Sequence, residues 1–210
     1  MDPKQAYDFW ASLYDTNKNN TRDLEAVALK QTLADIAFNS VLEIGCGTGK
    51  NTGWLLNKSE KVLGVDLSQG MLDQAREKYH GPMVNFINAN INEDWFFADT
   101  SFDLVTFSLV LEHIEDLASV FKKAFSVLLP GGYAYVGELH PFKQYTGTKA
   151  RFDTADGRQI VDCYNHHVSD FTMAATAAGF TILTLNEHFD TADRNEIPRI
   201  ITILLRKPEQ

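Results

Sequence analysis

The sequence predicts an α/β protein built on a doubly wound, mostly parallel sheet of seven strands. Short apolar runs that suit buried strands alternate with helix-compatible segments between residues 41 and 139. A glycine-rich turn joins the first of these strands to the helix that follows it. Two later apolar runs, at residues 180–185 and 200–205, are expected to pair as a C-terminal antiparallel hairpin at the edge of the sheet.

Length, charge and cysteine content restrict the class of protein. The 210 residues fit a single domain over 1–210, and 44% apolar with 22% charged residues is typical of a globular chain. A net charge of -9 without basic clusters argues against a nucleic-acid partner. The sequence shows neither a membrane span nor a secretory leader, and its two cysteines, Cys46 and Cys163, predict reduced thiols. We therefore expect a cytoplasmic monomer or homodimer without nucleic-acid or membrane partners.

The individual elements follow from periodicity and from capping residues. Thr21, Ser68 and Ser169 are placed to cap helices that run to residues 33, 79 and 178. A further helix over 117–128 is expected to stop at the Pro-Gly-Gly of residues 130–132. The remaining strands are predicted at 41–44, 61–65, 83–87, 102–107 and 133–139, and a loop at 140–148.

The glycine turn is the first functional signal. Residues 41–49 read V-L-E-I-G-C-G-T-G, an apolar strand followed by glycines at alternate positions. Because glycine has no Cβ, its backbone adopts positive φ and a ligand can lie directly against it. The next apolar run ends in Asp66. A carboxylate at that strand tip is placed to accept hydrogen bonds from the two hydroxyls of a ribose.

Two classes of ligand use such a unit, and two details separate them. Dinucleotide sites use G-x-G-x-x-G, whereas the spacing here is G-x-G-x-G. Glu43 precedes the turn, and its carboxylate would repel a pyrophosphate but suits a ligand that carries an ammonium and a sulfonium. With G-V-D-L-S at residues 64–68, this pattern resembles the first two motifs of class I S-adenosylmethionine-dependent methyltransferases, in particular the type 11-like, small-molecule branch.

The resemblance spans residues 41–139 and implies the Rossmann-like methyltransferase fold with S-adenosylmethionine (AdoMet) as cofactor. It implies that Leu67 and Met71 flank the adenine. It also implies that Asn90, where relatives often carry an acid, accepts a hydrogen bond from the adenine amino group. The residues expected to bind the cofactor are Tyr14, Glu43, Gly45, Cys46, Gly47, Gly49, Asp66, Leu67, Met71, Asn90, Ile91, Ser108 and Leu109.

The segment before the first strand has two interpretations. Tyr7, Phe9, Trp10 and Tyr14 lie close together before a polar stretch at residues 15–20. Such aromatic side chains are commonly part of a core. In methyltransferases of this type, however, the corresponding segment often folds over cofactor and substrate. The resemblance therefore implies a helical lid or cap over residues 1–38, with Tyr14 nearest the methionine part of the cofactor and the polar stretch as a hinge.

Candidate catalytic residues are sought beyond the carboxyl ends of the strands, where ligands bind in open parallel sheets. His140 directly follows the fifth strand and is the first candidate for a general base, although it could simply hydrogen-bond the loop. The segment 140–168 is expected to be a substrate-side insertion. Glu138 is expected to orient a neighbour, and His113 to be structural. His166 and His167 point to opposite faces if extended, so no metal site is predicted.

The expected function is transfer of a methyl group from AdoMet to a small-molecule acceptor, whose nucleophilic atom can be oxygen, nitrogen or carbon. A nicotinamide-dependent oxidoreductase shares the strand–turn–helix unit and the acid at the strand tip, but Glu43 and the glycine spacing disfavour it. A catalytically silent binding protein of the same fold is the second alternative, because a fold does not prove chemistry.

Overall fold

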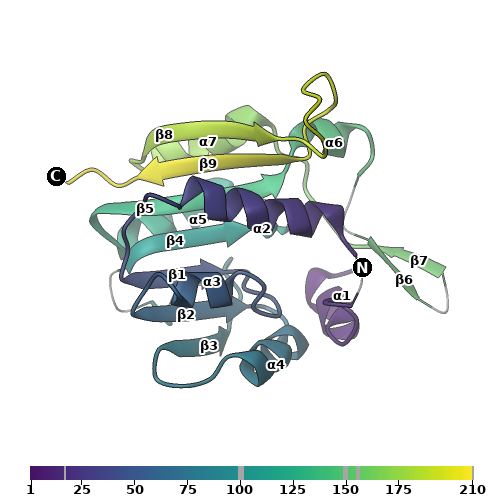
Figure 1. Cartoon of the computed structure of the whole chain (residues 1–210), viewed down its shortest axis with the longest axis horizontal. Coiled ribbons are helices and arrows are strands. Elements are labelled where there is room, and N and C mark those ends of the chain that lie inside the picture. Colours follow the sequence, from purple (N-terminus) through teal and green to yellow (C-terminus); the bar gives the residue numbers. More distant parts are fainter. Residues whose placement is uncertain (17, 99–101, 149–150, 155–156, 210) are drawn as a thin grey trace.

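The computed structural model describes residues 1–16, 18–98, 102–148, 151–154 and 157–209. Its centre is a seven-stranded sheet in the order β3-β2-β1-β4-β5-β9-β8 (Figure 1). The strands are β1 (Ser40–Ile44), β2 (Lys61–Asp66), β3 (Val84–Asn88), β4 (Phe102–Ser108), β5 (Leu128–Leu139), β8 (Thr181–His188) and β9 (Ile200–Arg206). The strands β1 to β5 pair in parallel, while β9 runs antiparallel to both β5 and β8. The predicted fold class is therefore confirmed, including the C-terminal hairpin.

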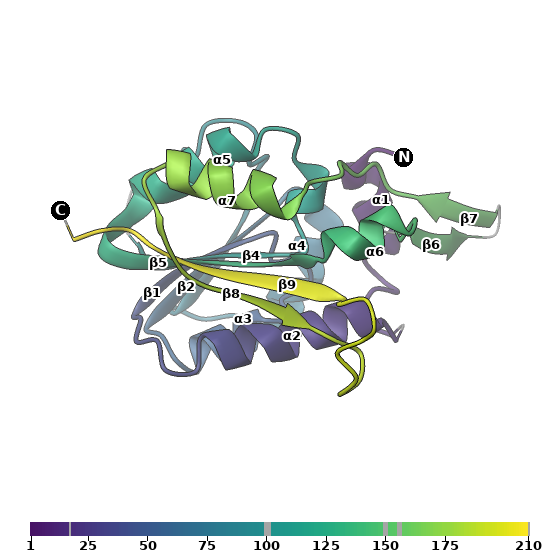
Figure 2. The ribbon, with the colours of Figure 1, turned by 90° about the horizontal axis from the view of Figure 1, so that it is seen from above.

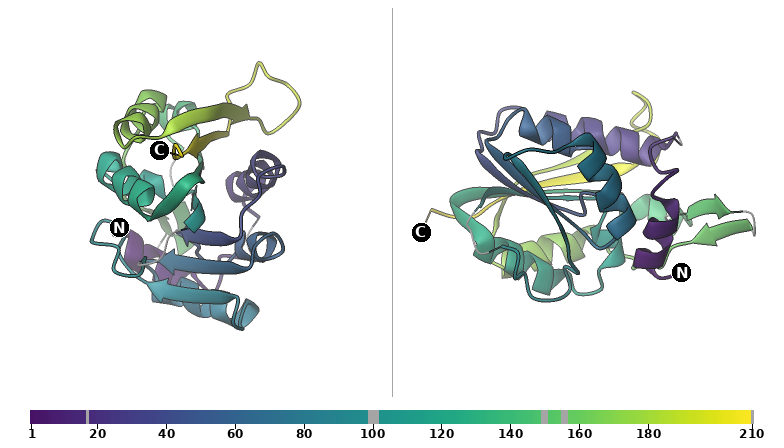
Figure 3. Two further views of the ribbon diagram at one scale, coloured as in Figure 1. Left: turned by 90° about the vertical axis from the view of Figure 1, so that its left-hand side faces the viewer. Right: turned by 90° about the horizontal axis from the view of Figure 1, so that it is seen from below.

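Helices cover both faces of the sheet. The helices α2 (Asn20–Thr32) and α3 (Thr52–Leu56) lie on one face, and α5 (Leu117–Val127) and α7 (Val168–Ala177) lie on the other (Figures 2 and 3). The larger core lies under α5 and α7, where the rings of Phe107 and Phe121 pack edge to face with centroids 6.0 Å apart. The smaller core lies under α2 and α3 and includes Leu29 and Tyr135. Burial on both faces explains why the central strands are continuous apolar runs.

Two of the three predicted caps are wrong. Ser68 caps α4 (Gln69–Lys78) as expected, because its hydroxyl accepts a hydrogen bond from the Met71 backbone N–H at 3.1 Å. The helix α2 begins earlier than predicted, however, and its cap is Asn19 rather than Thr21. His167 rather than Ser169 caps α7. Each true cap lies two residues before the predicted one, because more than one residue near these helix starts can accept the free N–H groups.

The segments after α5 differ most from expectation. β5 already begins at Leu128, so the Pro-Gly-Gly of residues 130–132 lies inside the strand, at a shift in register against β4. The predicted loop at residues 140–148 contains the short helix α6 (Pro141–Tyr145). The rest of the proposed insertion at 140–168 contains the antiparallel pair β6 (Arg151–Thr154) and β7 (Gly157–Ile160). Residues 149–150 and 155–156 of the proposed insertion lie outside the described residues. Elements of four or five residues show too little periodicity to be recognised in sequence.

The N-terminus lies beside the strand ends. The helix α1 (Pro3–Trp10) is near the carboxyl ends of the parallel strands and next to the β6–β7 pair (Figure 1). Its start is held by hydrogen bonds between the Met1 amino group and the Ile160 carbonyl, and between the Asp162 N–H and the Met1 carbonyl. Among the described residues, none of the helices has the length and apolar character that a membrane crossing requires.

Candidate active site

A cavity of about 360 Å³ lies beyond the carboxyl ends of β1, β2 and β4. Strand order reverses between β1 and β4, and such switch points are the usual ligand sites of open α/β sheets. Residues of α1 and of the segment 162–164 complete its walls. Ten of the thirteen residues predicted to bind the cofactor line it: Tyr14, Gly45, Gly47, Asp66, Leu67, Met71, Asn90, Ile91, Ser108 and Leu109.

The glycine turn forms one wall of the cavity. The N–H groups of Gly45 and Cys46 donate to the Val65 carbonyl, which holds the turn against the end of β2. Gly47 adopts a φ of 54°, and a Cβ built on it would meet no atom within 4 Å. The open space over Gly47 belongs to the cavity, so a ligand can lie directly on this backbone.

Asp66 faces the cavity from the tip of β2. Its Oδ2 accepts a hydrogen bond from the Gly47 N–H, and its Oδ1 accepts one from the Ser68 N–H, both at 2.8 Å. Each carboxylate oxygen retains a further acceptor position, which suits a pair of vicinal hydroxyls. Burial raises the pKa of Asp66, and the two backbone hydrogen bonds oppose that rise. The residue therefore combines a fixed orientation with free acceptor capacity.

The wall beyond Asp66 is more apolar. Met71 is buried at the start of α4, and Leu67 precedes it on the same wall. Ile91 lies opposite, with Asn90 beside it. The Asn90 side-chain oxygen accepts a hydrogen bond from the Asn92 N–H at 3.0 Å, which leaves it one further acceptor position. Apolar surfaces with one amide oxygen at the rim are compatible with a flat base such as adenine.

The segment after β4 is held in an unusual conformation. Leu109 is the only described non-glycine residue with a positive φ, at 54°, and its N–H donates to the Gly137 carbonyl. Glu138 Oε1 accepts hydrogen bonds from the N–H groups of Val110 and Leu111, at 2.9 and 2.8 Å. Glu138 thus fixes the backbone of the segment after β4. Strained backbone that its surroundings hold firmly is frequent at ligand sites.

The aromatic residues of the N-terminal segment form a cluster over the cavity. The rings of Trp10 and Tyr14 lie edge to face with centroids 5.0 Å apart, and Tyr7 stacks on Trp10 at 6.1 Å. The Arg22 guanidinium covers the Tyr14 ring at 4.2 Å, and burial raises the pKa of Tyr14 to about 12. Asp15, at the start of the proposed hinge, accepts a hydrogen bond from the Thr48 hydroxyl of the glycine turn; residue 17 lies outside the described residues.

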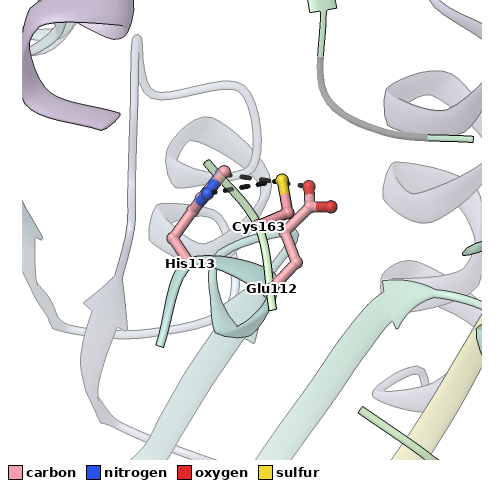
Figure 4. A group of neighbouring side chains, drawn as sticks. All are labelled: Glu112, His113 and Cys163. Atoms are coloured by element: carbon pink, nitrogen blue, oxygen red, sulfur yellow. Dashed lines mark hydrogen bonds and ion pairs between the residues drawn. The ribbon is translucent and has the colours of Figure 1, made fainter. Parts of the chain in front are cut away.

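Sequence reasoning missed a further group of residues that line the cavity. His113, from the 3-10 helix η1 (Leu111–His113), lines the cavity together with Tyr7, Asp162 and Tyr164. His113, Glu112 and Cys163 converge, and one candidate ligand atom from each lies within 4.8 Å of the others (Figure 4). Both ring nitrogens of His113 already have hydrogen-bond partners, Tyr7 Oη and the Asp162 carbonyl. We therefore interpret the group as a hydrogen-bonded cluster.

Three predicted cofactor residues do not line the cavity. Glu43 is buried within β1, where it accepts a hydrogen bond from the Thr52 hydroxyl at 2.5 Å, and burial raises its pKa to about 8. The Cys46 side chain packs instead with Leu72 and other apolar residues behind the turn. Gly49 faces the Tyr79 ring, which a Cβ would approach to 3.0 Å. These residues shape the turn from behind, because alternate positions of the strand and turn face away from the ligand side.

His140 is also placed differently from expectation. Its side chain is fully buried at the start of α6 and is absent from the cavity wall. Nδ1 accepts a hydrogen bond from the Phe142 N–H at 3.2 Å, and Nε2 lies 3.1 Å from Glu187 Oε1. Because both ring nitrogens are used and neither faces the cavity, this geometry does not support the prediction of His140 as a general base. His140 caps a helix and tethers β8.

Comparison with known proteins gives the family. The family described as "Methyltransferase domain" matches residues 42–136, which run from β1 into β5. This range contains the glycine turn, Asp66 and the segment after β4. Residues 42–136 of the chain form a methyltransferase domain of this family.

Curated relatives match over different lengths. The chain is 32% identical over 162 residues to the biotin biosynthesis bifunctional protein BioHC of Cellvibrio japonicus, which covers 77% of this chain and 30% of that protein. It is 38% identical over 99 residues to demethylmenaquinone methyltransferase of Chlorobaculum parvum, a match that covers 47% of this chain and 40% of that protein. An uncharacterized methyltransferase of Emericella nidulans is 27% identical, and the match covers 95% of this chain and 83% of that protein. The chain thus spans less than half the length of the first two proteins.

Solved structures share the whole fold. The DhpI complex with S-adenosylhomocysteine (SAH) superposes with a TM-score of 0.76 at 24% identity, covering 98% of this chain and 95% of that one. The N-methyltransferase NodS of Bradyrhizobium japonicum WM9, also bound to SAH, gives 0.73 at 17% identity over the full length of both chains. AdoMet is the cofactor of the family. The open space over Gly47 and the free acceptor positions of Asp66 fit this cofactor.

Proposed function

We propose that the protein transfers the methyl group of AdoMet to a small-molecule acceptor within the cavity beyond β1, β2 and β4. The observation that carries this proposal is that the glycine turn and Asp66 line the same cavity as Tyr7, His113 and Tyr164. Its volume of about 360 Å³ and its cover by α1 suit a small acceptor better than a polymer.

The cofactor roles follow from the chemistry of the lining residues. Asp66 accepts hydrogen bonds from the ribose hydroxyls, Leu67 and Met71 flank the adenine, and Asn90 accepts from its amino group. The methionine part lies along Gly45 and Gly47, with Tyr14, Ser108 and Leu109 beside it. Ile91 adds apolar surface next to Asn90. AdoMet supplies an electrophilic methyl group on a sulfonium, so the protein mainly has to orient the acceptor and exclude water.

The names of relatives bear on the acceptor only in general terms. BioHC is named for biotin biosynthesis, and the Chlorobaculum parvum protein is named a demethylmenaquinone methyltransferase. Both names point to small molecules, which supports the proposed substrate class without choosing an acceptor. A cytoplasmic location, which the reduced thiols favour, is consistent with such a substrate.

Two measurements test the proposal. Isothermal titration calorimetry should show binding of AdoMet and SAH and little affinity for NAD, because the turn lacks the third glycine at dinucleotide spacing. A screen of metabolites with AdoMet, followed by mass spectrometry, should then detect a product heavier by one methylene unit. Tight NAD binding without AdoMet binding would favour the oxidoreductase. AdoMet binding without any product across a broad metabolite panel would favour the catalytically silent binding protein.

A further inference from the structure

The cavity wall contains a tyrosine–histidine pair from segments more than 100 residues apart. Tyr7 Oη of α1 lies 3.0 Å from His113 Nε2, and both side chains line the cavity. We propose that Tyr7 and His113 form a proton relay that deprotonates a hydroxyl acceptor during methyl transfer, and that the acceptor is a small hydroxylated aromatic molecule. This inference rests on the proposed methyl transfer and adds the proton acceptor and the substrate class.

The hydrogen bonds of His113 determine which of its nitrogens can take a proton. Nδ1 lies 2.9 Å from the Asp162 carbonyl oxygen, which can only accept, so Nδ1 carries the ring hydrogen. Nε2 of the neutral ring then keeps its lone pair and accepts from Tyr7. Burial raises the pKa of Tyr7 well above its usual range, so the phenol holds its proton and acts as the donor. The Tyr7 oxygen retains acceptor capacity for a substrate hydroxyl.

The surroundings of His113 suit a positive ring. The titratable groups that face it are Tyr7, Glu112, Cys163 and Asp66. Glu112 Oε1 lies 3.9 Å from Nε2; burial raises the pKa of Glu112 and the His113 ring opposes that rise, so the carboxylate and an imidazolium stabilise each other. The Cys163 sulfur lies 3.8 Å from Nδ1 and donates to the Val161 carbonyl. The arrangement of base, orienting carbonyl and nearby carboxylate follows the logic of a catalytic triad.

The walls of the cavity indicate the acceptor. Tyr7, Tyr14 and Tyr164 all line the cavity, and the rings of Tyr7 and Tyr14 lie edge to face with centroids 6.2 Å apart. Aromatic walls favour a flat aromatic ligand through edge and stacking contacts. A neutral amine needs no base to attack a methyl group, whereas a weakly acidic hydroxyl becomes a good nucleophile only as it loses its proton. A phenol-type hydroxyl satisfies both requirements.

The step balances with no further reactant. As the acceptor oxygen forms its bond to the methyl carbon, the bond between that carbon and sulfur breaks and its electron pair goes to sulfur. The hydroxyl proton passes to the Tyr7 oxygen while the Tyr7 proton passes to His113 Nε2. The products are an aryl methyl ether and SAH. After they leave, the imidazolium releases its proton to solvent and the neutral pair is restored.

A first test needs no turnover. Two-bond ¹H–¹⁵N correlation spectra of the whole protein should show His113 protonated on Nδ1. 4-Nitrophenol, whose anion absorbs visibly, should bind to the protein–SAH complex with a lower apparent pKa than in His113→Asn. Asn keeps a donor for the Asp162 carbonyl but offers no base, and His80→Asn, at an exposed histidine, is the matched control. A ring protonated on Nε2, or equal pKa values of the ligand in both proteins, contradicts the relay.

A second test uses methylation of 4-methylphenol, a phenol that stays protonated near neutral pH and therefore needs a base, with formation of SAH measured by mass spectrometry. His113→Asn and Tyr7→Phe should lower kcat about 100-fold with KM changed less than threefold, because a general base typically contributes 10²–10⁴-fold. His113→Gln retains a hydrogen-bond partner for Tyr7 without a base, so activity restored by Gln would reduce His113 to a positioning role and overturn the relay. If AdoMet binds by calorimetry but 4-nitrophenol does not bind and 4-methylphenol is not methylated, the aromatic acceptor is wrong. Absent AdoMet binding would instead refute the proposed function.

Discussion

Removal of the Asp66 carboxylate is the most informative perturbation of the cofactor site. Asp66→Ala takes away the acceptor for the N–H groups of Gly47 and Ser68 and the proposed acceptor for the two ribose hydroxyls. A hydrogen bond to a charged group contributes about 1.5–3 kcal/mol. Since about 1.4 kcal/mol corresponds to a tenfold change in affinity, the Kd for AdoMet should rise about tenfold to a hundredfold. The freed backbone groups should also lower the melting temperature by about 2–4 °C for each kcal/mol lost.

Calorimetry with AdoMet and SAH measures the affinity, and circular dichroism measures melting. Asp73→Ala is the matched control, because Asp73 lies on α4, is 60% exposed and pairs only with neighbouring side chains in the described part of the chain. Asp66→Asn separates the loss of the charge from the loss of the backbone hydrogen bonds. Its amide oxygen still accepts one of these hydrogen bonds, while its NH₂ group faces the other backbone donor. A folded Asp66→Ala protein with unchanged affinity would remove Asp66 from the cofactor site and refute this reasoning.

Three further predictions concern the buried Glu138, the contacts of Asp8 and the N-terminal helix α1. Burial raises the pKa of Glu138 from 4.5 to about 8, so its contribution to stability is present below pH 4.5 and is lost as the pH rises through 8. Glu138→Gln cannot ionise, but its amide oxygen still accepts from the N–H groups of Val110 and Leu111. In urea unfolding, the free energy of unfolding of the variant should therefore rise relative to that of the wild type between pH 5 and 9. A difference between the two proteins that does not change with pH would contradict this prediction. Asp8 accepts hydrogen bonds from the Ser68 hydroxyl and the Gly70 N–H, so Asp8→Ala should accelerate hydrogen exchange in α1 and weaken AdoMet binding, whereas Gln5→Ala should do neither. Hydrogen exchange in α1 should slow when AdoMet binds. Deletion of residues 1–14 should reduce the affinity for AdoMet strongly but lower the melting temperature only slightly. Equally slow exchange with and without AdoMet would identify α1 as fixed core.

Residues next to the strand ends could be predicted from the sequence because their position follows from local rules. An apolar run, a glycine turn and an acid at the next strand tip define one end of a cavity wherever they occur in a parallel sheet. Gly47, Asp66, Leu67 and Met71 all line the cavity for this reason. The order of strands and helices follows in the same way, because periods of 2 and 3.6 residues are visible in single segments.

The orientation of side chains near the strand ends could be determined only from the tertiary structure. Glu43 and His140 have suitable chemistry and lie beside the carboxyl ends of β1 and β5, yet Thr52 and Glu187 hold them away from the cavity. Strand position alone does not show which partner a buried polar group will find, because the partner comes from another element. The short helix α6, which determines how His140 leaves β5, has no periodic signal of its own.

The acceptor end of the cavity depended on the fold alone. Tyr7, His113 and Asp162 come from α1, η1 and the segment after β7, and no spacing in the sequence links them. They meet because α1 packs over the strand ends and the Met1 carbonyl bonds the Asp162 N–H. The sequence by itself therefore determined the fold class and the proposed cofactor half of the site, which are local in origin. Long-range packing decided which side chains face the acceptor, since contacts between distant segments are not encoded in any one of them.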